Sequence, residues 1–167
     1  MNEPALVIIK PDGIKKQLVG DILAKLAQTG LELVGMRIAG TSRELAGEHY
    51  KHLKHKPFFN EIVAYLAGDY HQTRKLIALV YYGRRAIAKC REAAGATNPE
   101  EAAPQTIRGS YGRITTDGLF ENVVHVSSTA REAEREIKLW FDPQEILVSL
   151  YPTKKAAAGM IGRKVWA

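Results

Sequence analysis

The sequence predicts a single α/β domain in which strands and helices alternate. The chain has 167 residues, which is enough for one well-formed core but few for two. Apolar residues make up 46% and charged residues 25%, the usual balance of a globular protein. Short apolar runs rich in β-branched residues alternate with segments whose apolar residues recur at helical spacing.

The first strand and the first helix are bounded by turn residues. Leu6-Val-Ile-Ile9 is an apolar run that ends in Lys10-Pro-Asp-Gly13, a turn signature that brings a lysine to the end of the strand. Apolar residues between Val19 and Leu26 follow helical spacing, and Gly30 suits the position just after a helix. Residues 31–39 then predict a second strand.

That second strand is expected to place Val34, Met36 and Ile38 on one face, because side chains alternate along a strand. Thr41 lies three residues before a glutamate, which is capping-box spacing. We therefore expect a helix that begins at Thr41 and continues to about Leu53.

The middle of the chain predicts a helix, a strand and another helix before a long connection. Residues 58–67 carry an apolar stripe at helical spacing, residues 75–82 predict a strand, and residues 85–94 predict a helix. Between Gly95 and Glu121 neither a helical nor a strand period is sustained. So long a connection in a compact domain is either misassigned or functional, and its hydroxyl, arginine and turn residues favour oxyanion binding.

The segment after this connection places a histidine where a strand meets a helix. Asn122-Val-Val-His-Val-Ser-Ser128 is a β-branched run, and Thr129 with Glu132 has the capping-box spacing of a following helix. Glu136 borders the buried stripe of that helix, so its carboxylate needs a partner, for which the imidazole of His125 is credible. The pair would fix the tautomer and leave the other nitrogen free to attack. A lone histidine in an apolar strand is more often structural, and this segment alone leaves that reading open.

Charge and composition narrow the range of partners. The net charge of +6 favours anions such as nucleotides, nucleic acid or acidic surfaces. No run approaches the roughly 18 apolar residues of a membrane span, and the N-terminus lacks the layout of a secretory signal, so we expect a cytoplasmic protein that does not bind membranes. Cys90 is the single cysteine, and we expect it to pack in the core.

Three histidines recur at every third position, at His49, His52 and His55. A metal site on a helix prefers histidines four residues apart together with a further ligand. We therefore interpret His52 and His55 as solvated side chains, and we expect no metal ligands from protein side chains.

Eight passages together resemble the nucleoside diphosphate kinase family, over nearly the whole chain from Ala5 to about Pro143. They occur in the family's order, which makes coincidence a poor explanation. The passages are Ile9-Lys-Pro-Asp-Gly13, Leu18-Val-Gly20, His49-Tyr50, Lys56-Pro-Phe-Phe59, Gly95-Ala-Thr-Asn-Pro99, Thr106-Ile-Arg-Gly109, Asn122-Val-Val-His125 and Glu134-Arg-Glu-Ile-Lys-Leu-Trp-Phe141.

The resemblance implies a ferredoxin-like fold, in which helices cover a four-stranded antiparallel sheet and a long loop serves the active site. It also implies ping-pong transfer of the γ-phosphoryl of a nucleoside triphosphate to a nucleoside diphosphate through a phosphohistidine at His125. Glu136 and Ser127 would orient the imidazole, and Mg²⁺ would bridge the phosphates. The residues expected to hold the phosphates, ribose and base are Lys10, Tyr50, Phe58, Arg91, Thr97, Arg108 and Asn122.

The chain departs from the family pattern in four places. His125-Val-Ser-Ser-Thr129 replaces the family's usual His-Gly-Ser-Asp-Ser. Residues 113–120 and 67–75 lie in segments longer than usual, and either Leu119 or Phe120 is a candidate to close the base site. The tail, residues 153–167, matches no family pattern; we expect a domain over residues 1–152 and subunit contacts by the tail.

The resemblance also implies a homo-oligomer, with a hexamer favoured and a tetramer possible. Two other classes of function stay open. One is a basic domain that binds nucleic acid, although strands 7–9 and 123–124 are aliphatic where RNA-binding sheets carry exposed aromatics. The other is a scaffold without activity, which the presence of His125, Lys10 and Arg108 disfavours.

Overall fold

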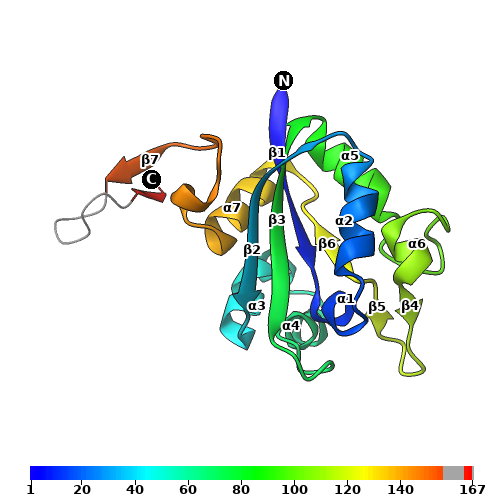
Figure 1. Cartoon of the computed structure of the whole chain (residues 1–167). Helices are drawn as coiled ribbons and strands as arrows, with labels where there is room; N and C mark the ends of the chain where they lie inside the picture. Colours follow the sequence, from blue (N-terminus) through cyan, green and yellow to red (C-terminus); the bar gives the residue numbers. More distant parts are fainter. Residues whose placement is uncertain (156–163, 167) are drawn as a thin grey trace.

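The computed structural model describes residues 1–155 and 164–166. Its centre is a four-stranded antiparallel sheet with the order β2-β3-β1-β6 (Figure 1). The strands are β1 (Asn2–Ile9), β2 (Glu32–Gly40), β3 (Lys75–Arg84) and β6 (Val124–Val126). The expected ferredoxin-like, four-stranded antiparallel sheet is therefore confirmed.

Helices cover both faces of the sheet. Figure 1 shows α2, α5 and α6 on one side and α7 on the other, with α3 and α4 at the lower end. The helices are α1 (Pro11–Lys15), α2 (Val19–Ala27), α3 (Arg43–His49), α4 (Phe59–Leu66), α5 (Ala86–Ala94), α6 (Ile107–Tyr111) and α7 (Ala130–Trp140), with 3-10 turns η1 (Lys51–Leu53) and η2 (Pro143–Glu145).

This double cover explains the apolar composition of the two central strands. Residues 5–9 of β1 and residues 76–81 of β3 are buried without alternation, because helices pack against both faces of the sheet. Cys90 of α5 belongs to the same core, as expected. With these strands covered, the sheet offers no open face of the kind that RNA-binding sheets use.

The edge strand β2 corrects one expectation. Val34 is buried, whereas the side chains of Met36 and Ile38 are 48% and 69% exposed. A β-bulge between Leu33 and Gly35 shifts the register against β3, so the side chain of Val34 faces the opposite side of the sheet from those of Met36 and Ile38. A one-residue bulge reverses the facing of every later side chain, and simple alternation cannot reveal it.

The helix predicted from Thr41 begins at Arg43, with its N-cap one residue later than expected, and it ends sooner. The N-cap is Ser42, whose hydroxyl accepts from the Leu45 amide, and α3 ends at His49. The 3-10 turn η1 then continues the chain. By contrast, the start of α7 is as predicted, because the Thr129 hydroxyl accepts from the amide of Glu132.

The connection between Gly95 and Glu121 contains more structure than the sequence indicated. It holds α6 and a small hairpin of β4 (Arg113–Ile114) and β5 (Phe120–Glu121), which lie side by side near α1 in Figure 1. Elements of five and two residues are too short to show a period. For the same reason, the sequence of α1 predicts only a turn.

The C-terminal strands β7 (Thr153–Lys155) and β8 (Lys164–Trp166) pair with each other beyond the main sheet (Figure 1). Trp166 ties this pair to the domain, because its indole Nε1 donates to the carbonyl of Phe141 at 2.8 Å. Among the described residues, no helix combines the length and the apolar character needed to cross a membrane.

Candidate active site

A pocket of about 530 Å³ opens where the ends of β1 and β6 meet η1, α4 and the β4–β5 hairpin. Its wall combines basic, aromatic and aliphatic side chains. Eight residues singled out in the sequence line it: Lys10, Tyr50, Phe58, Arg91, Thr97, Arg108, Asn122 and His125. The fold therefore brings together groups that are spread over more than a hundred positions.

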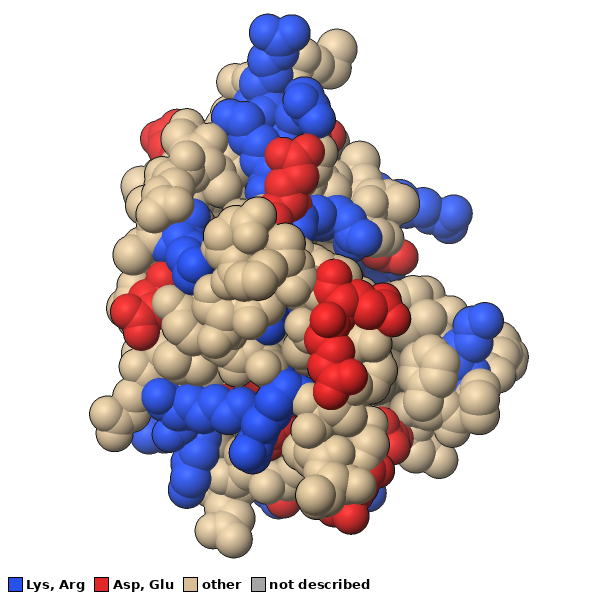
Figure 2. All heavy atoms as spheres, turned by 90° about the vertical axis from the view of Figure 1, so that its right-hand side faces the viewer, with Lys and Arg blue, Asp and Glu red and all other residues tan. Residues whose placement is uncertain are grey.

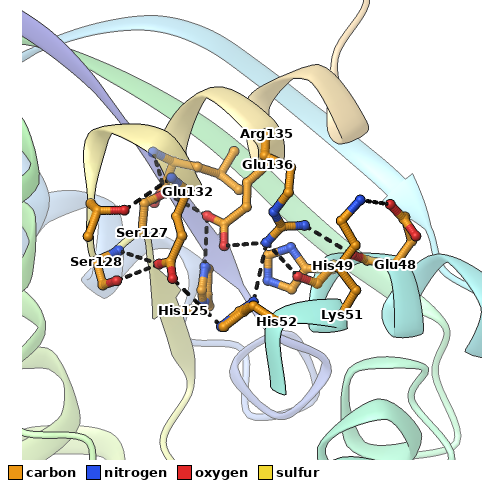
Figure 3. Close-up of polar contacts among 12 residues, drawn as sticks. Glu48, His49, Lys51, His52, His125, Ser127, Ser128, Glu132, Arg135 and Glu136 are labelled. Carbon is orange, nitrogen blue, oxygen red and sulfur yellow. Dashed lines mark hydrogen bonds and ion pairs between the residues drawn. The ribbon is translucent and has the colours of Figure 1, made fainter. Parts of the chain in front are cut away.

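The two other predicted residues, Ser127 and Glu136, are buried behind His125 (Figure 3). Oε2 of Glu136 lies 3.1 Å from Nε2 of His125 and accepts from the hydroxyl of Ser127 at 2.6 Å. The contact occupies Nε2, and no hydrogen bond between described residues occupies Nδ1. The expected pairing of imidazole and carboxylate is present.

Glu136 is held in its ionised form. Burial alone would raise the pKa of this carboxyl, but the charge and hydrogen bond of His125, with help from His49 and Ser127, lower the pKa to about 2. An ionised carboxylate at Nε2 favours a proton on that nitrogen. It would also stabilise positive charge that develops on the ring when Nδ1 attacks an electrophile.

His49 is a neighbour of the site to which the sequence analysis assigned no role. Its ring is buried and lies edge-on to His125, with 4.4 Å between ring centroids. Nε1 of Trp140 donates to Nδ1 of His49 at 3.1 Å, and burial, followed by the nearby His125, lowers the pKa of His49 well below its usual value. A neutral His49 therefore packs against His125. Its position three residues after the buried Ala46 was the available signal.

His49, His125 and Glu136 also have potential metal-ligand atoms within 4.8 Å of one another. Two imidazoles suit zinc or copper better than magnesium, which prefers oxygen ligands. Because Glu136 is already engaged by His125 and Ser127, the group is better described as support for the imidazole. His52 and His55 are exposed, as expected, although His52 also lines the pocket.

Lys10 is a buried cation in the pocket wall. Its ammonium donates to the side-chain carbonyl of Asn122 and lies 4.2 Å from the centre of the Tyr65 ring. Burial, partly offset by the charge of Asp12, lowers the pKa of Lys10 to about 8. The amide nitrogen of Asn122 donates to the carbonyl of Thr97 at 2.8 Å, so one asparagine joins the lysine to the loop after α5.

Arg108 is a second buried cation, held by main-chain carbonyls. Its guanidinium donates to the carbonyls of Gly95 at 2.8 Å and Val124 at 3.0 Å. Burial and then the charge of Arg91 lower its pKa to about 10, which still leaves it cationic at neutral pH. Arg91, Arg108 and Lys10 give the pocket the positive charge that a phosphate chain requires.

A strained backbone position, Val123, lies just before β6, the strand that carries His125, and next to the end of β1 at Lys10. Val123 has φ +55°, which is rare for a β-branched residue. Its amide donates to the carboxylate of Asp12 at 2.9 Å, and its carbonyl accepts from the amide of Lys10 at 2.9 Å. A Cβ at Gly13 would lie 3.2 Å from the same carbonyl, so glycine allows this close approach. The turn after β1 therefore fixes the backbone between Asn122 and His125.

The outer part of the pocket is apolar. Phe58 is 45% exposed, and both candidates for the opposite side, Leu119 and Phe120, line the pocket with Ile62 of α4. Both therefore stay candidates for closing a base site. Ile62 belonged to the apolar stripe of its helix, which gave no sign that one edge of that stripe faces a ligand.

The surface charge is mixed where the face on the side of α2, α5 and α6 is visible (Figure 2). Lysine and arginine side chains gather toward the upper and lower parts of this face, and acidic side chains lie between them. Nucleic-acid-binding proteins more often present a continuous basic stripe. This face therefore gives no support to the nucleic-acid alternative.

The family model of nucleoside diphosphate kinase matches residues 3–146. The chain belongs to the nucleoside diphosphate kinase family. The nucleoside diphosphate kinase of Pyrococcus furiosus is 44% identical over 144 residues, which are 86% of each chain. The crystal structure of the nucleoside diphosphate kinase of Aquifex aeolicus has 34% identity and a TM-score of 0.78, covering 87% of this chain and 99% of that one.

A third similar protein is the nucleoside-diphosphate kinase of Borrelia burgdorferi, whose structure is a transition state mimic with bound vanadate and ADP. It has 28% identity and a TM-score of 0.79, and the match covers 89% of this chain and 92% of that one. The activity of the nucleoside diphosphate kinase family is ping-pong phosphoryl transfer through a phosphohistidine. The present chain is thus a phosphotransferase that acts on nucleotides.

Proposed function

We propose that Nδ1 of His125 is the atom that carries the phosphoryl group. In the first half-reaction its lone pair forms a bond to the γ-phosphorus, and the bond from that phosphorus to the bridging oxygen breaks. The nucleoside diphosphate leaves with the electron pair, and a second nucleoside diphosphate reverses the step. The observation that carries this proposal is the contact of Nε2 with the buried Glu136, which leaves Nδ1 for the substrate.

Glu136 and Ser127 act on the ring of His125 and do not touch the substrate. The proton stays on Nε2 throughout, so the ring becomes cationic as the nitrogen–phosphorus bond forms. The carboxylate of Glu136 stabilises that charge, and Ser127 fixes the carboxylate by its hydrogen bond of 2.6 Å. Replacement of the usual glycine by Val126 leaves these contacts in place.

The cationic groups of the pocket bind and neutralise the phosphates. Charge on the transferred group spreads over its oxygens in the transition state, and Lys10 and Arg108 are buried and already positioned by other groups. Preorganised cations cost little reorganisation when the charge develops. Arg91, Tyr50, Thr97 and Asn122 complete the contacts to phosphates and ribose, and Phe58 stacks on the base.

Mg²⁺ is the proposed metal, bound mainly through the phosphates of the nucleotide. The pocket wall contains two carboxylates, Glu61 and Glu132, and magnesium commonly combines phosphate and water ligands with few protein groups. The residues present therefore fit such an ion without a dedicated protein cage. When bound, the ion would neutralise phosphate charge, while Lys10 and Arg108 do so from the protein side.

We further propose a homo-oligomer, with a hexamer favoured over a tetramer, and a cytoplasmic location, where nucleotides are made and used. Apolar side chains on the exposed edge strand β2, namely Leu33, Met36 and Ile38, support association.

We propose that residues 1–152 form the catalytic domain and that the tail, residues 153–167, contributes subunit contacts. Residues 156–163 and 167 of that tail lie outside the described residues. Light scattering on the full chain and on a chain ending at residue 152 tests the number of subunits and the contribution of the tail to subunit contacts.

Brief incubation with γ-labelled ATP and Mg²⁺ tests the function. We expect a protein-bound label that is stable in alkali and labile in acid, and that several nucleoside diphosphates discharge. A label that persists in a His125→Ala variant would refute the role of His125. Failure of every nucleoside diphosphate to discharge a genuine label would refute the second half-reaction.

A further inference from the structure

The β4–β5 hairpin, residues 113–121, forms one wall of the nucleotide pocket. Three residues near its tip, Gly118, Leu119 and Phe120, line the pocket opposite α4. The ladder contains only two residue pairs, Arg113 with Glu121 and Ile114 with Phe120. A two-stranded hairpin of this length is marginal by itself, so its position depends on contacts outside it.

The side chain of Glu121 supplies such contacts. It is 6% exposed, although it lies on a short surface hairpin. Oε2 accepts from Lys16, just after α1, at 2.8 Å and from Nε of Arg113 on β4. Oε1 lies 2.9 Å from Nε2 of His71, which belongs to the loop between α4 and β3. One carboxylate therefore joins three segments.

His71 and Glu121 also connect the two loops that the family resemblance identifies as longer than usual. His71 is 9% exposed, and its ring packs edge-on against Tyr65, with 5.1 Å between centroids. Tyr65 lines the pocket beneath the ammonium of Lys10. A series of side-chain contacts therefore runs from Glu121 through His71 to Tyr65, which lines the site. The residue after Glu121 in the sequence is the site residue Asn122.

The charge of Glu121 suits an anchor. Burial would raise the pKa of its carboxyl, but the hydrogen bonds from Arg113, Lys16 and His71 lower the pKa to about 2. The carboxylate is therefore ionised at neutral pH and bonded through both oxygens. Hydrogen bonds that involve an ionised group are stronger than neutral ones, and loss of their common acceptor would release all three partners together.

We propose that Glu121 is a positioning residue that anchors the β4–β5 hairpin as a wall of the nucleotide pocket and so sets affinity for the nucleoside part of the substrate. This proposal rests on the proposed function of the pocket. It assigns Glu121 an effect on nucleotide affinity, since its contacts hold the wall that carries Leu119 and Phe120. The His125–Glu136 pair is held by separate contacts and is expected to keep its geometry.

The decisive experiment compares Glu121→Ala with the wild-type chain in steady-state kinetics and in calorimetric binding of ADP. We expect KM and Kd to rise about tenfold and kcat to stay within about twofold, the pattern of a loss of binding shared by ground and transition states. Arg113→Ala removes one of the three contacts from a side chain that is 64% exposed, and should raise KM by a smaller factor. It provides the test if Glu121→Ala does not fold.

Glu92→Ala is the matched control, because Glu92 also forms an ion pair, with Arg85 at 3.4 Å, but on the exposed surface of α5. It should leave KM, Kd and kcat unchanged. Unchanged KM and Kd in folded Glu121→Ala or Arg113→Ala would overturn the proposal, as would a fall in kcat at constant KM. A wild-type chain that forms no phosphohistidine would instead refute the proposed function, and ADP calorimetry would still report the effect of Glu121.

Discussion

Nε2 of His125 lies 3.1 Å from Oε2 of Glu136, and this carboxylate is completely buried. An unpaired carboxylate at such a depth would be costly, so the pair explains both the position of the glutamate and the orientation of the imidazole. It also determines which ring nitrogen faces the pocket.

Glu136→Ala should slow phosphoryl transfer by on the order of 100-fold, the size of effect seen when one preorganised electrostatic group is removed. Nucleotide affinity should change much less, because orientation and stabilisation of the ring matter mainly in the transition state. Rapid-quench measurement of phosphohistidine formation at saturating ATP tests this. Glu134→Ala is the control, since Glu134 pairs with Lys138 at 2.9 Å on the same helix. Transfer rates that match in the two variants would contradict the assigned role.

The two serines after His125 should differ in their importance. Ser127→Ala removes buried hydrogen bonds to Glu136 and to the main chain of Leu6, and should lower the free energy of unfolding by about 1–3 kcal/mol. Ser128 is exposed and bonds to Glu132, so Ser128→Ala should change that free energy by less than about 0.5 kcal/mol. Urea unfolding measures both values. An equal loss in the two variants would show that the buried serine does not support Glu136.

The affinity for nucleotides should depend on pH through Lys10. Its pKa is lowered to about 8, so the free enzyme loses this positive charge as the pH rises through that value. We expect kcat/KM, which reports the free enzyme, to fall above about pH 8. Lys10→Arg keeps the charge at these pH values and should move the fall to higher pH, even if activity is lower throughout. A wild-type profile that stays level to pH 10 would contradict this assignment.

Asp12 should stabilise the strained backbone at Val123. Asp12→Ala would leave the buried amide of Val123 without its acceptor, at a cost of about 1–3 kcal/mol in the free energy of unfolding. Because Val123 lies between Asn122 and His125, activity should also fall. The control is Asp21→Ala, because Asp21 is an exposed residue of the first turn of α2. Urea unfolding and kcat measured together check the expectation, and an Asp12→Ala variant as stable as the control would contradict it.

The sequence was most informative about the site at positions where few other residue types could take the same role. Lys10 at a strand end, Gly95 after a helix and His125 before a capped helix are local signals, and the family motifs placed them in one site. The partner of His125 was also predictable, because Glu136 borders an apolar stripe and a carboxylate there must be neutralised.

Other features depend on contacts between distant segments and leave no local pattern. The bulge at Leu33 reverses the facing of Met36 and Ile38, and only the pairing with β3 reveals it. The hairpin that ends at Glu121 contains two residue pairs, too few to produce a period. Its link to His71 joins positions fifty residues apart. A single sequence indicates that Glu121 and His71 are polar, but not that they are in contact.

Identification of the phosphorylated nitrogen tests the central claim most directly. The wild-type chain would be phosphorylated with ATP and Mg²⁺, denatured in alkali and examined by phosphorus NMR, which distinguishes the two phosphohistidine isomers. We predict the isomer phosphorylated on Nδ1 of His125, because Glu136 occupies Nε2. Phosphorylation on Nε2, or on a residue other than His125, would contradict the account.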